Sequence, residues 1–399
     1  FRRVLFRSKT IFFIMMSLCI LLWFLTTLKR KPSLRNDSID AIIPAYNEGP
    51  CLAQSLENLL LNPYFHRVIC VNDGSTDDTE IIMHKVKEKW GERLITVTQK
   101  NTGKGGALMN GLNYATCEQV FLSDADTYVP PDGDGMGFML AEIENGADAV
   151  GGIPSTHLPG AGLLPHIRAT VKLPMIVMKR TLQQLLGGAP FIISGACGMF
   201  RTDVLRKFGF SDRTKVEDLD LTWTLVANGY CIRQANRCIV YPQECNTLGD
   251  EWKRWRRWIV GYAVCMRLHK SLILSRFGIF SILPMVLVVL YGVAIYLITW
   301  QHITLTIGPH AIVLSLFPII WVGVVCSIGA FSAWYHRCWK LIFLAPFSVF
   351  YVLLAYLIWI IYGLIAFFTG REPLRDKPTR YTAVVDAPNN NAPPATRGC

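Results

Sequence analysis

The sequence predicts an α/β domain, with a largely parallel sheet covered by helices, joined to apolar segments that enter a membrane. The first observation is the alternation of short β-branched runs with helical patterns from residue 39 to about residue 240. The second is a set of three long apolar runs in the last third of the chain. Because 51% of the 399 residues are apolar, there is room for one domain of roughly 230 residues and several membrane segments.

Five strands and three helices are predicted within the domain. Each helix between two strands supports a parallel connection. The strands are expected at residues 39–44, 67–71, 94–98, 119–122 and 149–153, and the helices at residues 51–61, 79–90 and 105–115. In such sheets ligands bind at the carboxyl ends of the strands. Polar residues directly follow three of these strands, so a binding site is predicted there.

The chain on either side of the domain is predicted to meet a membrane. Residues 1–36 form an apolar segment with a basic flank, which stays in the cytosol if translation starts at Met15 or Met16. Residues 37–248 then form a cytosolic domain. Residues 249–272 mix Trp, Arg and apolar side chains, as expected of an amphipathic helix in the membrane interface.

Residues 273–370 are predicted to be a transmembrane region. Three apolar runs, each long enough to cross about 30 Å of hydrocarbon, lie at residues 277–300, 312–334 and 341–368. The loop at 301–310 lacks Lys and Arg and favours the outer face, whereas the basic loop at 336–340 favours the inner face. The same count leaves a basic tail outside, so the number and direction of the spans stay open. The tail, residues 371–399, is expected to be partly disordered.

Charge and cysteine content exclude several classes of site. The formal charge of +11 comes from 40 Lys and Arg against 29 Asp and Glu, and much of the excess lies beside apolar segments. That placement suits anionic lipid headgroups better than nucleic acid. The 12 cysteines show no metal-like or paired spacing, so neither a zinc site nor a disulfide framework is indicated.

Acidic residues are the main candidates for chemistry. Asp124 and Asp126 lie on a turn after an apolar strand, where a divalent cation could bridge them and a diphosphate. Asp73 follows another strand, and Asp218 lies at a predicted helix start. Each pattern has a simpler interpretation, as a solvated turn or as charge that complements a helix dipole. Lys104, in a glycine-rich helix start, could approach a phosphate, although it lacks the P-loop spacing.

Taken together in this order, the motifs resemble the processive branch of glycosyltransferase family 2, which includes poly-N-acetylglucosamine, chitin, hyaluronan and cellulose synthases. The resemblance covers about residues 39–270 and rests on the combination of motifs. It implies a Rossmann-like nucleotide-sugar-binding domain of the GT-A type. Two positions depart from the family: Val216 replaces the Thr of Thr-Glu-Asp, and Arg254 replaces the Gln of Gln-x-x-Arg-Trp. By itself, this second motif could be only an interfacial anchor.

The resemblance implies a role for each candidate residue. The residues expected to contact the donor nucleotide are Pro44, Tyr46, Glu48, Asp73, Lys104 and Asp124. The expected ligands of the metal, Mg²⁺ or Mn²⁺, are Asp126 and Asp124. The catalytic base is expected to be Asp218, in a pair with Glu217. Contacts with the acceptor or the diphosphate fall to Ser194, Gly195, Cys197, Arg254, Arg257 and Trp258.

The expected function is the inverting transfer of a sugar from a UDP-sugar to a growing polysaccharide, coupled to export of that polysaccharide. The first candidate for the donor is UDP-N-acetylglucosamine. One alternative is the addition of one sugar to a membrane lipid, and another is a nucleotide-binding transporter or scaffold. The expected partners are the donor, a polysaccharide or lipid acceptor, membrane lipids and an accessory export subunit, with no nucleic acid. The protein is expected to be integral to the plasma (inner) membrane, with its catalytic domain in the cytosol.

Overall fold

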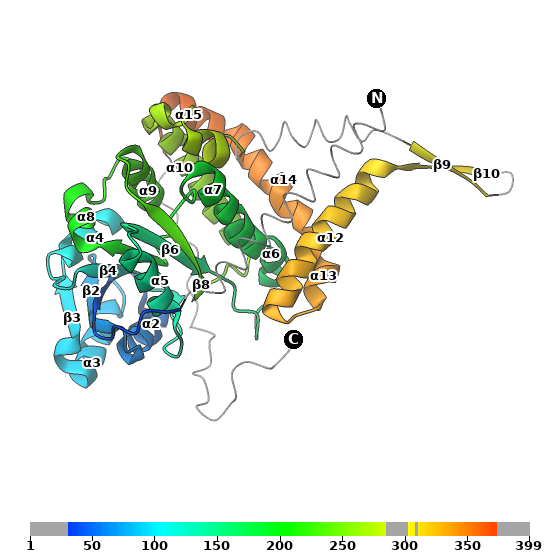
Figure 1. Cartoon of the computed structure of the whole chain (residues 1–399). Helices are drawn as coiled ribbons and strands as arrows, with labels where there is room; N and C mark the ends of the chain where they lie inside the picture. Colours follow the sequence, from blue (N-terminus) through cyan, green and yellow to red (C-terminus); the bar gives the residue numbers. More distant parts are fainter. Residues whose placement is uncertain (1–30, 285–301, 308–309, 373–399) are drawn as a thin grey trace.

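The computed structural model describes residues 31–284, 302–307 and 310–372. An eight-stranded mixed sheet forms the body of the protein, and an arm of helices extends from one side of it (Figure 1). The strand order is β3-β2-β1-β4-β7-β6-β8-β5. The strands are β1 (Ile39–Ala45), β2 (Phe65–Asn72), β3 (Leu94–Thr98), β4 (Gln119–Leu122), β5 (Thr127–Tyr128), β6 (Ala149–Pro154), β7 (Gly198–Arg201) and β8 (Ile232–Pro242).

The parallel half of the sheet agrees with the prediction. Strands β3, β2, β1 and β4 are parallel, and α2 (Gly49–Leu61), α3 (Thr79–Trp90) and α4 (Gly103–Leu112) lie between them in the chain. Alternate side chains of β1 face opposite layers, so Ile42 packs with α4 and Ile43 packs with α2. The carboxyl ends of β1, β2 and β4 therefore meet at one edge.

The other half of the sheet is mixed, which corrects the prediction of a largely parallel sheet. β7 is antiparallel to both of its neighbours, β4 and β6, and β5 is antiparallel to β8. β7 contains no β-branched residue, the feature by which the other strands were predicted. Because Leu122 pairs with Gly198, β7 starts where β4 ends. Ser194 and Gly195 thus come close to the turn that carries Asp124.

Two long helical segments stand beside this edge of the sheet. α6 (Leu163–Pro174) continues through a π-turn, η2 (Met175–Lys179), into α7 (Arg180–Gly187), and this segment was not predicted. Pro174 lacks an amide hydrogen, which accounts for the irregular turn after it. The predicted amphipathic helix is confirmed as a helix, α10 (Leu248–Leu268). The other helices of the domain are α5 (Gly135–Glu144), α8 (Thr202–Phe208) and α9 (Glu217–Ala227).

The C-terminal region contains a hairpin that was not predicted. β9 (His302–Ile307) and β10 (His310–Ser315) pair antiparallel and lead into α12 (Leu316–His336). The expected loop at 301–310 is therefore largely strand, and the apolar run from residue 312 begins as strand. The helical stretch Lys340–Thr369 comprises α13 (Lys340–Leu344), η5 (Ala345–Ser348), α14 (Val349–Ile358), η6 (Trp359–Gly363) and α15 (Leu364–Thr369).

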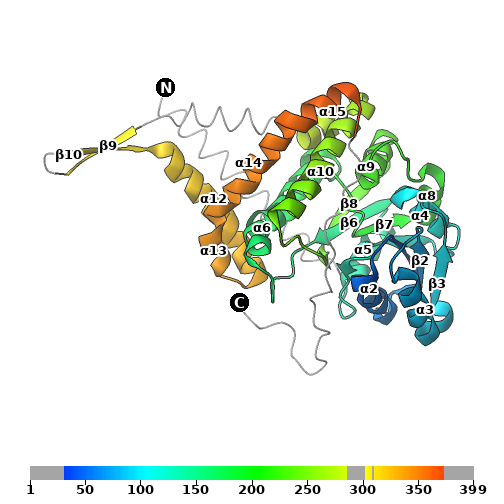
Figure 2. The same ribbon diagram turned by 180° about the vertical axis from the view of Figure 1, so that it is seen from behind.

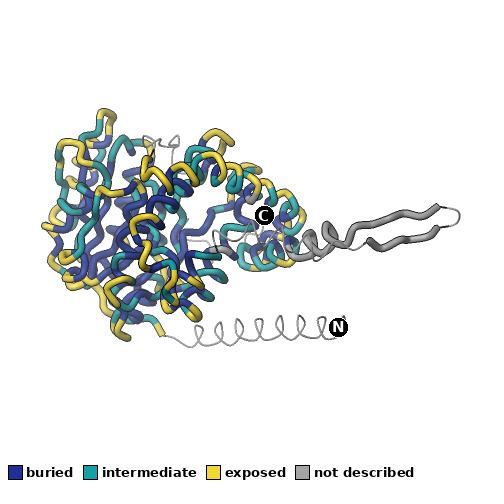
Figure 3. The backbone as a smooth tube through the Cα atoms, turned by 90° about the horizontal axis from the view of Figure 1, so that it is seen from above, coloured by how far each residue is buried: buried dark blue, intermediate teal, exposed yellow. Residues whose placement is uncertain are grey.

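The helical arm packs on the two long segments of the domain (Figure 2). α12 and α13 contact α6, whereas α14 and α15 contact α10. Within the described residues, Lys340–Thr369 is the one helical stretch whose length and composition would suit a membrane crossing. It exposes large apolar side chains, among them Phe343, Phe347, Leu353, Ile360 and Phe368. In the body of the protein, buried stretches of backbone lie inside and exposed ones at the periphery (Figure 3). The expected N-terminal anchor up to residue 30, the run at 285–300 and the tail beyond residue 372 lie outside the described residues.

Candidate active site

A cavity of about 660 Å³ lies between the strand ends and the wall formed by α6, α7 and α10. It joins residues that are far apart in the sequence, from strand ends in the first half and helix faces in the second. Of the residues predicted to form the site, those that line the cavity are Pro44, Tyr46, Glu48, Asp73, Lys104, Asp124, Asp126, Ser194, Gly195, Glu217, Asp218, Arg254, Arg257 and Trp258.

Cys197 is the exception, and its predicted contact with the acceptor or diphosphate is corrected. Its side chain is fully buried in the core, with its Sγ 3.7 Å from Cys238 Sγ. A methyl group on Gly152 would overlap this sulfur atom. The thiol therefore points into the core and fills the space above Gly152. It does not face the cavity.

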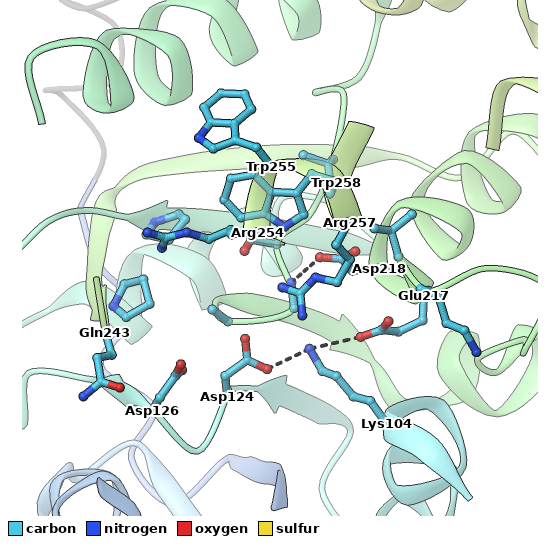
Figure 4. Close-up of a pocket in the computed structure, with 18 of the residues that line it drawn as sticks. Lys104, Asp124, Asp126, Glu217, Asp218, Gln243, Arg254, Trp255, Arg257 and Trp258 are labelled. Carbon is cyan, nitrogen blue, oxygen red and sulfur yellow. Dashed lines mark hydrogen bonds and ion pairs between the residues drawn. The ribbon is translucent and has the colours of Figure 1, made fainter. Parts of the chain in front are cut away.

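Lys104 lies at the centre of the acidic side of the cavity (Figure 4). Its Nζ is 2.7 Å from Asp124 Oδ1 and 3.1 Å from Glu217 Oε1. Burial would lower the pKa of Lys104, but the negative charges of Asp124, Glu217 and Asp218 outweigh it and raise the pKa well above its usual value. The charged ammonium group thus joins the turn after β4 to the start of α9.

Asp218 is held beside this pair by backbone amides. Its Oδ2 accepts the Gly195 N–H at 2.9 Å, and its Oδ1 accepts the Leu219 N–H at 2.9 Å. Burial raises the pKa of Asp218, and the charge of Glu217 raises it further, whereas Lys104 opposes the shift. An oriented carboxylate with a raised pKa on a cavity wall has the properties of a general base.

Asp73 positions the loop that leads to Lys104. Its Oδ1 accepts the Thr102 N–H at 2.8 Å and an amide hydrogen of Gln99 at 2.8 Å. Its Oδ2 accepts the Gly103 N–H at 2.9 Å. Gly103 begins α4 with a φ of 83°, a conformation that favours glycine. Asp73 lines the cavity, and its hydrogen bonds show that it also holds this loop in place, which the sequence did not indicate.

Asp124 and Asp126 present two carboxylates to the cavity from one turn (Figure 4). Asp126 Oδ1 accepts a hydrogen bond of 3.3 Å from Thr127 Oγ1. Such oxygen ligands fit Mg²⁺ or Mn²⁺. Within the described ranges, no cluster of three His, Cys, Asp or Glu side chains could hold a metal. A cation at this turn would therefore need further ligands from water and from donor phosphates.

The opposite wall of the cavity is cationic and centres on Glu244, which follows β8. Glu244 Oε2 lies 2.5 Å from Arg168 Nη1 and 3.2 Å from Arg254 Nη1, and Lys172 pairs with Oε1. Burial would raise the pKa of Glu244, but the three cations lower it far below its usual value. Arg254 also pairs with Glu251. The residue that departs from the family motif is thus anchored in a buried ionic network.

Arg257 and Trp258 follow Arg254 along α10 and line the cavity (Figure 4). The Trp258 ring centroid lies 5.5 Å from the Arg168 guanidinium carbon and 5.8 Å from that of Arg254. Cation–π contacts of this kind fix the orientation of the ring. Trp258 therefore connects the ionic network to the cavity.

Sequence reasoning missed the residues that α6, η2 and α7 contribute. The basic and apolar lining residues on this segment lie three or four positions apart, as expected of one helix face. They are Arg168, Val171, Lys172, Ile176, Lys179, Arg180 and Gln183. The helical spacing of basic residues within an apolar segment was a signal that could have identified them.

The loop before Asp218 is tied to the end of the helical arm. Glu372 Oε1 accepts the Thr214 hydroxyl hydrogen at 2.6 Å, and Glu372 Oε2 accepts the Lys215 N–H at 2.7 Å. On α10, Arg267 hydrogen-bonds the carbonyl oxygen of Phe368. The segment after α15 thus braces the start of α9.

Comparison with known proteins identifies the family. Residues 40–209 match glycosyl transferase family 2. The glycosyltransferase YaiP of Escherichia coli (strain K12) is 80% identical over 390 residues, which is 98% of each chain. The chain belongs to glycosyltransferase family 2. As an enzyme of this family, it is not the transporter or scaffold considered from the sequence.

Two further proteins resemble this family 2 glycosyltransferase. Poly-β-1,6-N-acetyl-D-glucosamine synthase of Staphylococcus aureus (strain COL) is 28% identical over 286 residues, or 70% of this chain and 67% of that one. A mannosyltransferase of Pyrobaculum calidifontis, solved with GDP-Man and Mn²⁺, has a TM-score of 0.52 at 18% identity. That likeness covers 90% of this chain and 98% of the other, and it confirms the α/β fold of the GT-A type.

Proposed function

We propose that this glycosyltransferase transfers a sugar from a UDP-sugar, with UDP-N-acetylglucosamine as first candidate, to a growing polysaccharide. The observation that carries the proposal is a single cavity that holds both the Lys104–Asp124 pair and the amide-anchored Asp218. The likeness to a poly-β-1,6-N-acetyl-D-glucosamine synthase supports the choice of sugar.

The strand-end side of the cavity suits the donor. Pro44, Tyr46 and Glu48 line it beyond β1 and would contact the nucleoside, with Asp73 behind them. Lys104 would approach the diphosphate from the start of α4. Asp126 and Asp124 would hold Mg²⁺ or Mn²⁺, which when bound supplies positive charge against the leaving nucleoside diphosphate.

Asp218 acts as the base in the proposed reaction. Its carboxylate takes the proton from an acceptor hydroxyl, and the hydroxyl oxygen forms a bond to the anomeric carbon of the donor sugar. The bond from that carbon to the diphosphate breaks on the opposite side, so the configuration inverts. Glu217 keeps Lys104 in place, and Ser194, Gly195, Arg257 and Trp258 would border the acceptor sugar or the diphosphate.

The helical arm supports a membrane location. Lys340–Thr369 packs along α10 and exposes apolar side chains, so its insertion in the plasma (inner) membrane would bring the cavity to the cytosolic face. We assign the catalytic domain to residues 37–248, the interfacial helix to 249–272 and the membrane region to 273–370. Coupled export through this region, with or without an accessory subunit, completes the proposal.

A second candidate is transfer of one sugar to a membrane lipid. It is favoured by Arg254, whose guanidinium is bound by Glu244 and Glu251 where the processive enzymes have a glutamine. The two candidates share the donor site and the base, and differ in the acceptor and hence in the product.

Both candidates are tested by one experiment on membranes that contain the full-length protein. Radiolabelled UDP-sugars are supplied one at a time with Mg²⁺ or Mn²⁺, with and without EDTA, and the product is sized and digested. We expect metal-dependent turnover and a product of many sugars. A single sugar on a lipid would select the second candidate, transfer in EDTA would contradict the metal role, and no turnover of any donor would contradict both.

A further inference from the structure

Two basic residues in the cavity have no task in the proposed donor site. Lys179 ends η2, Arg180 begins α7, and both line the cavity. Arg168 and Lys172, on the same helix face, are paired with Glu244. Lys179 and Arg180 lie about two turns further along the same segment.

The guanidinium of Arg180 has no ion-pair or hydrogen-bond partner among the residues that the structure describes, and its Nη1 atom is buried. Burial lowers the pKa of Arg180, while Tyr262 and Asp218 act in the opposite direction. Arginine nevertheless remains charged in proteins. A buried donor atom without a hydrogen-bond partner is costly, and an anionic ligand would remove that cost.

The surroundings of the two cations strengthen such binding. Lys179 Nζ lies 5.6 Å from the centroid of the Phe191 ring, and Phe191 packs edge-on against Tyr262 at 5.5 Å. Ile176 also lines this part of the cavity. An apolar and aromatic wall excludes water, so the attraction between a cation and an anion is stronger there than in solvent.

The position is on the side of the base. Tyr262, Asp218 and Cys197 interact electrostatically with Arg180, and Phe191 links Lys179 to Tyr262 through ring contacts. Asp218 also lies beside the Lys104–Asp124 pair (Figure 4). An anion held by Arg180 would therefore sit next to the hydroxyl group that Asp218 deprotonates.

We infer that Lys179 and Arg180 bind an anionic group of the acceptor, a phosphate or a carboxylate, next to the attacking hydroxyl. The inference rests on the proposed function and specifies its acceptor class. The covalent step is unchanged: the hydroxyl oxygen bonds to the anomeric carbon, the diphosphate leaves, and the proton goes to Asp218. The anion only places the acceptor.

The test compares three acceptors on the full-length protein in detergent micelles. They are N-acetylglucosamine linked to a short polyisoprenyl diphosphate, an alkyl glucuronide, and a neutral alkyl N-acetylglucosaminide. We expect faster transfer to one or both anionic acceptors than to the neutral one. The first two acceptors distinguish a lipid phosphate from a sugar carboxylate. Equal transfer to all three would overturn the inference.

Variants then separate acceptor from donor. In Arg180→Gln and Lys179→Gln, we expect the acceptor KM to rise about 10- to 100-fold, as for loss of a charge-assisted hydrogen bond, with the donor KM unchanged. Lys85→Gln, an exposed change of the same charge on α3, is the matched control. Arg180→Lys keeps the charge and should recover part of the loss.

Each other outcome has a defined meaning. A rise in the donor KM would assign these cations to the donor diphosphate and overturn the inference. Thermal unfolding of each variant shows whether it folds, and Arg180→Lys replaces any variant that does not. If the wild-type protein consumes no donor at all, the proposed function fails. If it consumes donor but does not prefer anionic acceptors, only the acceptor inference fails.

Discussion

The two walls of the cavity are built in different ways. The strand-end wall carries acids around one lysine, and each of its groups follows a strand or starts a helix within a short motif. The helical wall carries cations from α6 and α10 around Glu244. Site residues that belong to short motifs can be predicted from the sequence. Site residues that come from the faces of several helices are brought together only by the fold.

The largest effect is expected at the strand-end wall, from Asp218→Asn. Loss of the proposed general base should lower the transfer rate by about 10²- to 10⁴-fold. Because the donor contacts lie elsewhere, the donor KM should change little. Steady-state kinetics with the preferred UDP-sugar measure both quantities. Asp212→Asn, an exposed neighbour outside the cavity, is the control, and a variant at Asp218 that kept full activity would remove this residue from the mechanism.

Lys104→Met should weaken the fold as well as the activity. The change leaves Glu217, whose side chain is 8% exposed, without its cation, and breaking a buried ion pair costs about 3 kcal/mol. Thermal or denaturant unfolding measures this loss. The double variant with Glu217→Gln removes the unpaired charge and should recover part of the stability. Lack of any recovery would show that Lys104 stabilises the fold through Asp124 alone.

The pH dependence should show the raised pKa of Asp218. The base must be ionised, so the transfer rate should fall as pH falls through this pKa, by about tenfold per pH unit below it. Because burial and Glu217 raise the pKa, the acid limb of kcat/KM should lie above the ordinary aspartate value of about 3.9. An acid limb at or below that value would contradict the burial of this carboxylate.

The smallest effect is expected at the helical wall, from Arg254→Gln, which restores the family's residue. Glu244 keeps Arg168 and Lys172 as partners, so the loss of stability should be about 1–2 kcal/mol. Glu244→Gln leaves three buried cations without their shared carboxylate and should cost more. Unfolding midpoints of the two variants rank them, and the reverse order would show that Glu251 is the more important partner of Arg254.

The contrast between the walls also describes what could be predicted. The parallel strands and their common edge could be predicted from the β-branched runs before Asp73 and Asp124, because a strand and the turn that follows it are local features. The antiparallel β7 and the segment α6–α7 were missed. Their places depend on pairing with β4 and on packing against α12, which involve residues far away in the chain.

The same distinction holds for single residues. Asp218 was predicted from its motif, but its hydrogen bond to the Gly195 amide depends on the register of β7 with β4. Cys197 was misplaced because a turn at Gly195 and Ala196 redirects the chain before β7, so its side chain enters the core while Gly195 stays at the cavity. The two positions differ by only two residues.

The brace from Glu372 to Thr214 and Lys215 has a practical meaning for the preparation of the protein. A shortened chain that ends after α10 would contain every motif by which the enzyme was recognised. It would nevertheless have lost the support of the loop that leads into Asp218. Such a fragment should still fold around its sheet and bind donor, but Asp218, the proposed base, would be poorly positioned. The lack of activity in such a fragment would therefore not contradict the proposed function of the full-length protein.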